Sequence, residues 1–365
     1  MTTIKDIANY LETIAPLSLQ ESYDNCGLIV GDPSMEVKGI TICLDSTEEV
    51  IMEAKKNGCN MVIAHHPIIF SGLKKLNGKN YIERTVIAAI KNDIAIYAAH
   101  TNMDNIIDGV NRMIADKIGL KNLQILSPKV GLLRKLVVFC PLDHAAVVRQ
   151  ALFSAGAGTI GNYDECSFNV EGNGSFRPGE SSNPFEGVKG QTSVVHEVRI
   201  EVIYESFKEK GILDAMRHAH PYEEVSHDIY SLNNEYQSIG SGIVGDLPED
   251  MDEMAFLKHV KSVMNTGVVK HTAIIGKKVK RVAICGGSGS FLLNEALKSG
   301  SQVFITADYK YHQFFDADGK IIIADIGHFE SEQFTMDLFK SFILKKFSKF
   351  AVRLTEVKTN PVNYL

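Results

Sequence analysis

The chain has 365 residues, 45% of them hydrophobic, with 44 acidic and 38 basic residues and a formal net charge of −6 at pH 7. A chain of this length can bury one large core or about two to three modest ones. Charges of both signs are mixed along the sequence, so no long basic run offers the electrostatic footprint of a nucleic-acid binder. No segment approaches the roughly 20 consecutive apolar residues of a membrane span. Composition therefore predicts a soluble globular protein with neither nucleic acid nor a membrane as its partner.

The first sixteen residues form an amphipathic pattern that is interrupted by Asp6 and Glu12, unlike the unbroken apolar run of a signal peptide. Six cysteines are scattered along the chain without any CxxC pairing. This usage favours reduced, mostly buried thiols and argues against thiolate metal sites. The sequence thus predicts a cytoplasmic protein whose chain begins with an ordinary helix.

Short β-branched runs alternate with amphipathic stretches in two parts of the chain, which is typical of βαβ units around a parallel sheet. In the first part, strands are expected at 39–44, 61–64 and 94–99, and helices at 47–57, 81–92 and 104–118. In the second, strands are expected at 281–285, 302–306, 320–324 and 350–354, and helices at 291–298 and 329–345. We therefore predict an α/β fold whose two halves, 1–130 and 235–365, form one metal-binding unit.

The middle of the chain, 131–234, has a different order of predicted strands and helices. Its expected elements are strand 135–140, helix 144–156, a strand near 165–170, strand 195–203, helix 205–219 and strand 224–231. This β-α-β-β-α-β order matches a ferredoxin-like unit, with the polar segment 171–190 as a hairpin connection. An inserted α+β domain is the prediction.

Polar side chains follow the predicted strands, and ligands of open parallel sheets bind beyond the carboxyl ends of the strands. These side chains are His65 and His66 after the second strand, His100 and Asp104 after the third, and Asp308, Asp325 and His328 in the second half. One edge of the sheet would then collect imidazoles and carboxylates from both halves.

Local geometry favours convergence of several of these groups. His328 and Glu332 lie four residues apart at the start of a predicted helix, so both project from one face. The neighbours His65 and His66 can both bind only where the strand ends and the chain turns, which Pro67 supports by excluding the α region for His66.

The predicted metal ligands are His65, His66, Asp104, His328 and Glu332. Three histidines and two carboxylates are too many for one tetrahedral site but suit two neighbouring divalent ions. With no cysteine among them, Zn²⁺, Mn²⁺ and Fe²⁺ are all admissible. The alternative is that each histidine merely caps a loop at the end of its strand.

Three further residues are candidates for catalysis. Asp308 and His312 are candidates for groups that support a ligand or contact substrate, although a polar helix start would also explain them. His100 is a weaker candidate at a strand end. The run 286–290, GGSGS, joins a strand to a helix and could cradle an anion, but it lacks the P-loop lysine and equally suits a tight turn.

Six motifs resemble those of the GTP cyclohydrolase 1 type 2 homologues, also called Nif-three-like dinuclear metal proteins. They are DNCGL at 24–28, AHHP at 64–67, HTNMD at 100–104, CGGSGS at 285–290, TADYKYH at 306–312 and GHFESE at 327–332. The resemblance implies the same five ligands, His65, His66, Asp104, His328 and Glu332, and a toroidal homohexamer. It also implies that the insert, with HPYEE at 220–224, is the PII-like or CutA-like domain of longer bacterial members. Tyr23 departs from the tryptophan of many members but retains an aromatic ring.

Two classes of function fit these residues. The first is a two-metal hydrolase acting on a small molecule, which the resemblance implies to be nucleotide-like. The second is a metal-dependent regulatory or scaffold protein that senses a small molecule without turnover. Metal-loaded protein screened against pooled nucleotides, cyclic amides and phosphoesters would separate the two classes.

Overall fold

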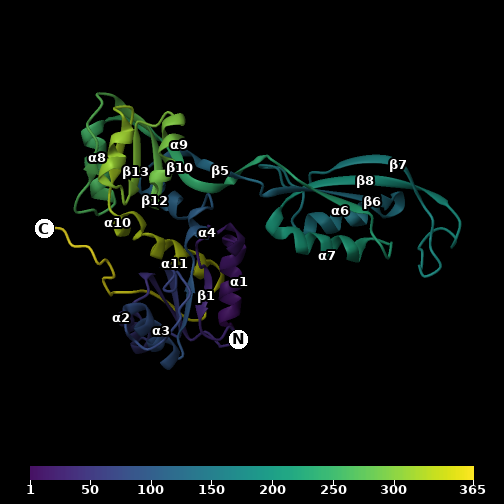
Figure 1. Ribbon diagram of the computed structural model, residues 1–365, viewed down its shortest axis with the longest axis horizontal. Coiled ribbons are helices and arrows are strands. Elements are labelled where there is room, and N and C mark those ends of the chain that lie inside the picture. The colour runs from purple at the N-terminus through teal and green to yellow at the C-terminus, as the bar shows by residue number, and fades with distance from the viewer. The chain divides into compact units, whose positions relative to one another are not determined.

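The computed structural model describes residues 1–365, which form two compact units (Figure 1). The outer unit comprises Met1–Pro128 and Gln237–Leu365, and the inserted unit comprises Lys129–Tyr236. None of the helices is long and apolar enough to cross a membrane. Each unit has its own sheets and core and is described separately.

The first sheet of the outer unit has the strand order β1-β4-β3-β2-β15. Its strands are β1 (Gly27–Val30), β2 (Gly39–Asp45), β3 (Met61–His66), β4 (Ala95–Ala98) and β15 (Ala351–Leu354). All neighbouring pairs are parallel except β1 with β4. The carboxyl ends of β2, β3 and β4 therefore meet at one edge of the sheet.

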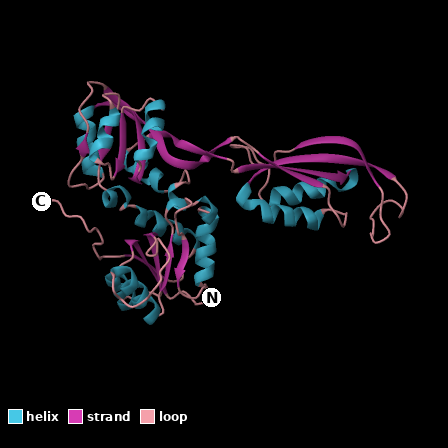
Figure 2. Ribbon diagram, viewed as in Figure 1, coloured by secondary structure: helices cyan, strands magenta, loops and turns pink.

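Helices cover this sheet, as Figure 2 shows in cyan. They are α1 (Ile4–Ile14), α2 (Glu48–Lys56), α3 (Tyr81–Lys91) and α11 (Thr335–Lys346). The short helix α4 (Thr101–Asp104) contacts the 3₁₀ turn η1 (Leu17–Leu19), and α5 (Val110–Ile118) packs against the second sheet. Helices α2 and α3 bury apolar residues against Val62 and Ala64, which lie on one face of β3. Alternation along the strand turns Ile63 and His65 to the other face, where the His65 ring lies 6.3 Å from that of Phe339 in α11.

The second sheet of the outer unit has the order β11-β14-β13-β12-β10-β5. Its strands are β5 (Lys121–Val130), β10 (Glu235–Asp252), β11 (Lys270–His271), β12 (Lys278–Ser288), β13 (Val303–Ala307) and β14 (Ile322–Asp325). Its helices are α8 (Glu253–Val263), α9 (Leu293–Lys298) and α10 (His328–Glu332), with 3₁₀ turns η4 (Ser290–Leu292) and η5 (Tyr311–Ala317). Strands β12, β13 and β14 are parallel, so their carboxyl ends also share one edge.

The inserted unit is a four-stranded antiparallel sheet with the order β7-β8-β6-β9. Its elements are β6 (Leu133–Pro141), η2 (Leu142–His144), α6 (Ala145–Ser154), β7 (Phe168–Phe176), β8 (Ser193–Glu205), η3 (Ser206–Lys208), α7 (Glu209–Ala219) and β9 (His227–Ser231). Both helices lie along one face of the sheet (Figure 2). Their apolar residues and those of β6 and β8 form one core that includes Val148, Leu152, Ile212 and Met216.

The predicted α/β class is confirmed, and several element boundaries differ from the expected ones. The helix expected at 329–345 is two helices, α10 and α11, and the helix expected at 104–118 is likewise divided between α4 and α5. The strand expected near 165–170 is β7, which extends to Phe176 into the segment expected to be a connection. The long strands β5 and β10 were not predicted, because Gly240, Gly242 and Gly245 obscure the pattern of β10.

Candidate metal centre

Four histidine side chains gather where β3, β4 and the start of α10 come together. His65 and His66 are the last residues of β3, His100 follows β4, and His328 begins α10. The His66 ring centroid lies 4.9 Å from that of His65, 5.3 Å from that of His100 and 5.2 Å from that of His328. Strand ends in different halves of the sequence thus supply one cluster of imidazoles.

Each of these histidines has its Nδ1 atom bound to an oxygen. His65 Nδ1 lies 2.8 Å from the Ala99 carbonyl oxygen, and His66 Nδ1 lies 2.7 Å from Asp45 Oδ1. His100 Nδ1 lies 2.9 Å from Asp24 Oδ1, and His328 Nδ1 lies 2.7 Å from Asp308 Oδ2. An acceptor at Nδ1 fixes the proton there and leaves the Nε2 lone pair available, which is the usual support of a metal-binding histidine.

The Nε2 atoms converge on the carboxylate of Glu332. Its Oε2 atom lies 3.0 Å from His66 Nε2, 3.1 Å from His328 Nε2 and 3.8 Å from His65 Nε2. Metal–ligand bonds near 2.1 Å place the ligands of one ion about 3 to 3.5 Å apart, so this spacing fits a divalent ion. His66, His328 and Glu332 form one group that could hold a metal ion, and His65, His66 and His100 form another.

Two buried atoms of this cluster have no hydrogen-bond partner. They are His65 Nε2 and Asp104 Oδ1, which lie 3.7 Å apart. A buried polar atom without a partner carries a desolvation cost of about 1 to 3 kcal/mol. A cation held between the imidazole nitrogen and the carboxylate would satisfy both atoms, so the residues present fit a metal ion.

The absence of a side chain at Gly287 leaves space for the Glu332 carboxylate. Gly287 has φ +62°, and a Cβ atom there would overlap Glu332 Oε1 and lie 3.4 Å from His328 Cε1. Its N–H donates to Ser331 Oγ at 2.9 Å, and Ser331 in turn donates to the His328 carbonyl at 2.7 Å. The GGSGS run is therefore a close packing surface for α10, and the structure explains its glycines without an anion.

Asp24 organises the side of the cluster that His100 occupies. Its Oδ2 atom accepts hydrogen bonds from the Thr101 N–H at 3.0 Å and from the Thr101 hydroxyl, while Oδ1 accepts from His100. Despite burial, which acts to raise it, these hydrogen bonds hold the pKa of Asp24 far below its ordinary value. Asp24 is thus ionised and holds His100 with its Nε2 free.

The remaining candidates are placed differently. Asp308 follows β13 in a left-handed conformation, φ +57°, that turns its carboxylate to His328 Nδ1. His312 is exposed in η5, where its ring contacts Tyr311, and it makes no contact with the cluster. Asp45 was not among the candidates, although it ends β2 beside His66 and the strand-end rule would have found it.

Burial and close contacts shift the pKa values of the side chains in the ion-free cluster. Burial lowers the pKa of His65 and raises that of Asp104 well above its ordinary value. Against the effect of burial, the hydrogen bonds that His66 donates to Asp45 and Glu332 raise its pKa to about 10. Against the same effect, Glu332 and Asp308 raise the pKa of His328 to about 9. The cluster therefore attracts positive charge to the Nε2 atoms around Glu332.

Two cavities adjoin the cluster. One of about 200 Å³ is lined by His100, Asp104 and Glu332 together with the exposed rings of Tyr23 and Phe291. The other, of about 410 Å³, lies on the side of His66 and His328 that faces the C-terminal segment. A small molecule can therefore reach the cluster from the first cavity.

Comparison with known proteins places this arrangement in a family. Residues 2–361 match the family described as Duf34/NIF3 (NGG1p interacting factor 3). A protein of Halalkalibacterium halodurans named "GTP cyclohydrolase 1 type 2 homolog" is 39% identical over 325 residues, which is 88% of this chain and 87% of that protein. A Bacillus subtilis protein of the same name is 34% identical over 371 residues, covering 99% of this chain and 98% of its own.

Solved structures similar to this chain point to the same family as the sequence relatives. The crystal structure of a Bacillus cereus protein related to NIF3 has a TM-score of 0.88 and 36% identity, covering 100% of this chain and 99% of that one. Staphylococcus aureus protein SA1388 has a TM-score of 0.79 and 29% identity over 100% of this chain and 99% of its own. The family resemblance of the six motifs is confirmed, and the chain belongs to the Duf34/NIF3 family.

Proposed function

We propose that the chain is a metal-dependent hydrolase with a dinuclear centre. One observation carries the proposal: the Nε2 atoms of His65, His66 and His328 surround the buried carboxylate of Glu332. Of these, His65 Nε2 has no hydrogen-bond partner, and neither has the buried Asp104 Oδ1 next to it. Such a set of nitrogen and oxygen donors, held from behind by hydrogen bonds, is costly to bury without cations.

The donors form two pairs near Glu332. His65 Nε2 lies 3.7 Å from Asp104 Oδ1, and His66 Nε2 lies 3.3 Å from His328 Nε2. These two pairs, together with Glu332, would hold two divalent ions. The absence of thiolates among the donors admits Zn²⁺, Mn²⁺ and Fe²⁺.

The chain's own residues have defined tasks in this proposal. When bound, two divalent ions supply Lewis acidity and lower the pKa of water toward neutrality. His100, which lines the 200 Å³ cavity, has its Nδ1 proton held by Asp24 and can accept a proton at Nε2. Asp308 holds the tautomer and orientation of His328 rather than contacting substrate.

Two observations support our proposal for the substrate class, the aromatic rings beside the first cavity and the relatives' name. The rings of Tyr23 and Phe291 are 62% and 64% exposed beside polar Asn105 and Ser241, which suits a flat polar ring. We propose a small nucleotide-like substrate, in keeping with relatives named GTP cyclohydrolase 1 type 2 homolog.

The test is a turnover screen of the full chain loaded with Zn²⁺, Mn²⁺ or Fe²⁺ against pooled nucleotides, cyclic amides and phosphoesters. We expect hydrolysis by the wild type, loss of hydrolysis in His65→Ala, and a shifted pH profile in His100→Gln. His218→Ala removes an exposed histidine of the inserted unit and serves as the control. Wild-type protein that binds metal and a member of the pool without turning it over would refute the hydrolase.

A metal-dependent sensor is the second candidate function. The inserted unit supports it, because that unit has its own core and a cavity of about 510 Å³ that contains none of the metal-centre residues. Its β-α-β-β-α-β order and its sheet order also support our assignment as a PII-like or CutA-like module. Binding without turnover in the screen favours this function.

For the assembly we propose a homohexamer, on the strength of the family resemblance. Light scattering of the purified chain should give about six times the mass of one chain. A monomer at micromolar concentration would count against the hexamer.

A further inference from the structure

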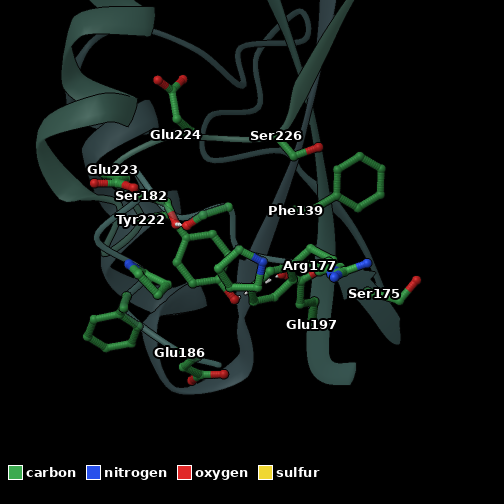
Figure 3. A pocket seen from close by; sticks show the side chains of 16 residues that line it. Phe139, Ser175, Arg177, Ser182, Glu186, Glu197, Tyr222, Glu223, Glu224 and Ser226 are labelled. Carbon is green, nitrogen blue, oxygen red and sulfur yellow. Dashed lines mark hydrogen bonds between the residues drawn. The ribbon is translucent and has the colours of Figure 1, made fainter. Parts of the chain in front are cut away.

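A cavity of about 510 Å³ lies within the inserted unit, where the ends of β6, β7 and β8 meet the segment after α7. Figure 3 shows the Tyr222 ring in the middle of the lining side chains, with Glu197 on one side and Glu223 on the other. This volume is typical of sites for small organic molecules. The metal centre contributes no residue to it, so the inference does not depend on the proposed hydrolase.

Aromatic rings line the cavity. The Tyr222 centroid lies 6.1 Å from that of Phe176 and 6.2 Å from that of Phe185, and Phe139 adds a further ring. The faces of aromatic rings carry negative partial charge and attract cations.

The hydrogen bonds behind this wall hold it in place. His220 Nε2 donates to the Phe139 carbonyl at 2.9 Å, and His220 Nδ1 accepts from the Tyr222 N–H at 3.1 Å. The Tyr222 hydroxyl donates to Glu197 Oε1 at 3.1 Å. Glycine at 174, which pairs with Val195 in the β7–β8 ladder, leaves room for the Glu197 carboxylate, which a Cβ atom would overlap. The site is therefore built before any ligand arrives.

Carboxylates outnumber cations around the cavity. Glu186, Glu197, Glu223 and Glu224 line it, and Arg177 is the single basic residue of the lining. Neither Arg177 nor any of the four glutamates takes part in an ion pair in the structure. Glu223 accepts a hydrogen bond from the Asn183 N–H at 2.7 Å, which fixes its position without neutralising its charge. Four carboxylates therefore face an aromatic wall, with Arg177 as the one basic side chain of the lining.

We propose that this cavity binds a small organic cation, a protonated or quaternary amine. The ammonium group lies against the Tyr222 and Phe176 rings within reach of Glu197 and Glu186, and the apolar part fills the space toward Phe185. Rings attract a cation and carboxylates compensate its charge, whereas an anion would meet four glutamates and one arginine.

Calorimetry of the full chain tests the proposal with benzyltrimethylammonium, phenethylammonium and spermidine as cations and benzylsulfonate as an anion of similar size. We expect at least one cation to saturate one site per chain below about 10 mM, more weakly at high salt, and benzylsulfonate not to bind. Glu186→Gln/Glu197→Gln and Tyr222→Ala should each weaken binding about tenfold. Asp228→Asn removes an exposed carboxylate of β9 outside the cavity and should leave binding unchanged.

Several outcomes would overturn the proposal. The first is that none of the three cations shows saturable binding. The second is that cation binding is unchanged in both cavity variants. The third is that benzylsulfonate binds and that Arg177→Ala abolishes this binding. Thermal melts report whether Tyr222→Ala remains folded. The isosteric glutamine variant decides the result if Tyr222→Ala does not fold.

Discussion

Aspartates behind the histidines determine how the metal centre presents its nitrogen atoms. Asp45 and Asp308 each accept the Nδ1 proton of a histidine at 2.7 Å. Each carboxylate fixes the tautomer and makes the opposite nitrogen a better donor. In the proposed centre, Asp45 and Asp308 would therefore contribute to the affinity for an ion that neither of them touches.

We predict that Asp45→Asn and Asp308→Asn each weaken metal binding about 10- to 100-fold while the fold is retained, because an amide supports the imidazole less strongly. Asparagine also tolerates the left-handed conformation of Asp308, so the backbone is undisturbed. Competition with a chelator, followed by metal analysis, measures the change. Asp316→Asn, an exposed carboxylate of η5, is the control. Affinities equal to the wild type in both variants would contradict the role of these hydrogen bonds.

Metal binding should strengthen as pH rises. With pKa values of about 10 for His66 and about 9 for His328, both imidazoles are protonated in the ion-free protein at neutral pH. An ion binds only neutral imidazole, so both protons must leave. Apparent affinity at this site should rise by up to about 100-fold per pH unit below pH 9. Calorimetry in buffers of different ionisation enthalpy counts the protons released, and an affinity independent of pH between 6 and 8 would refute the prediction.

The same shifts stabilise the ion-free fold with the opposite dependence on pH. Because both pKa values are raised, this contribution to stability is complete below the ordinary histidine pKa and is lost as pH rises through about 9 to 10. Melting temperatures of ion-free and ion-loaded protein should therefore diverge as pH increases.

Among the structural elements, the carboxyl end of β12 contains a glycine whose position depends on α10. Gly287→Ala introduces a Cβ atom against the Glu332 carboxylate at a positive φ, and it should cost about 2 kcal/mol or more as well as metal content. Gly300→Ala also places alanine at positive φ, +76°, but with no heavy atom within 4 Å, so it isolates the backbone cost of about 1 kcal/mol. Thermal melts and metal analysis compare the two variants. Equal effects would show that contact with Glu332 does not matter.

Strand ends were the most predictable part of the candidate site. The runs before His65 and before Asp325 are continuous and apolar, so the sequence places both residues at the carboxyl end of a buried strand. The Asp45–His66 pairing was missed because it depends on register between strands, which no local pattern reports. His312 follows Asp308 by four residues, but it lies exposed in η5, where its ring contacts Tyr311, and its role stays a prediction.

Helix boundaries were less predictable for a related reason. Apolar periodicity continues from Phe329 through Phe342, so the sequence indicates one helix, whereas the structure ends α10 at Glu332 and begins α11 at Thr335. The Gly287 N–H donates to Ser331 Oγ within α10, and such contacts between distant segments are invisible to a pattern of single residues.

For the whole molecule, the inserted unit should be dispensable for the metal centre. Its boundaries follow Pro128 and precede Gln237, in strands β5 and β10 that are neighbours in one sheet. A short turn containing glycine can join neighbouring strands. We expect a chain lacking 129–236 to fold and to bind as much metal as the full chain. A deletion variant that is folded by circular dichroism but metal-free would show that the insert belongs to the site.

A segment far along the sequence reaches back to the His66 side of the proposed centre. β15 pairs with β2, and the Thr359 hydroxyl donates at 3.1 Å to Asp45 Oδ2, the carboxylate that holds His66. Two segments 314 positions apart in the sequence therefore hold the same carboxylate. Loosening of this sheet edge would release Asp45 and with it His66, so local opening at β15 and loss of metal would occur together.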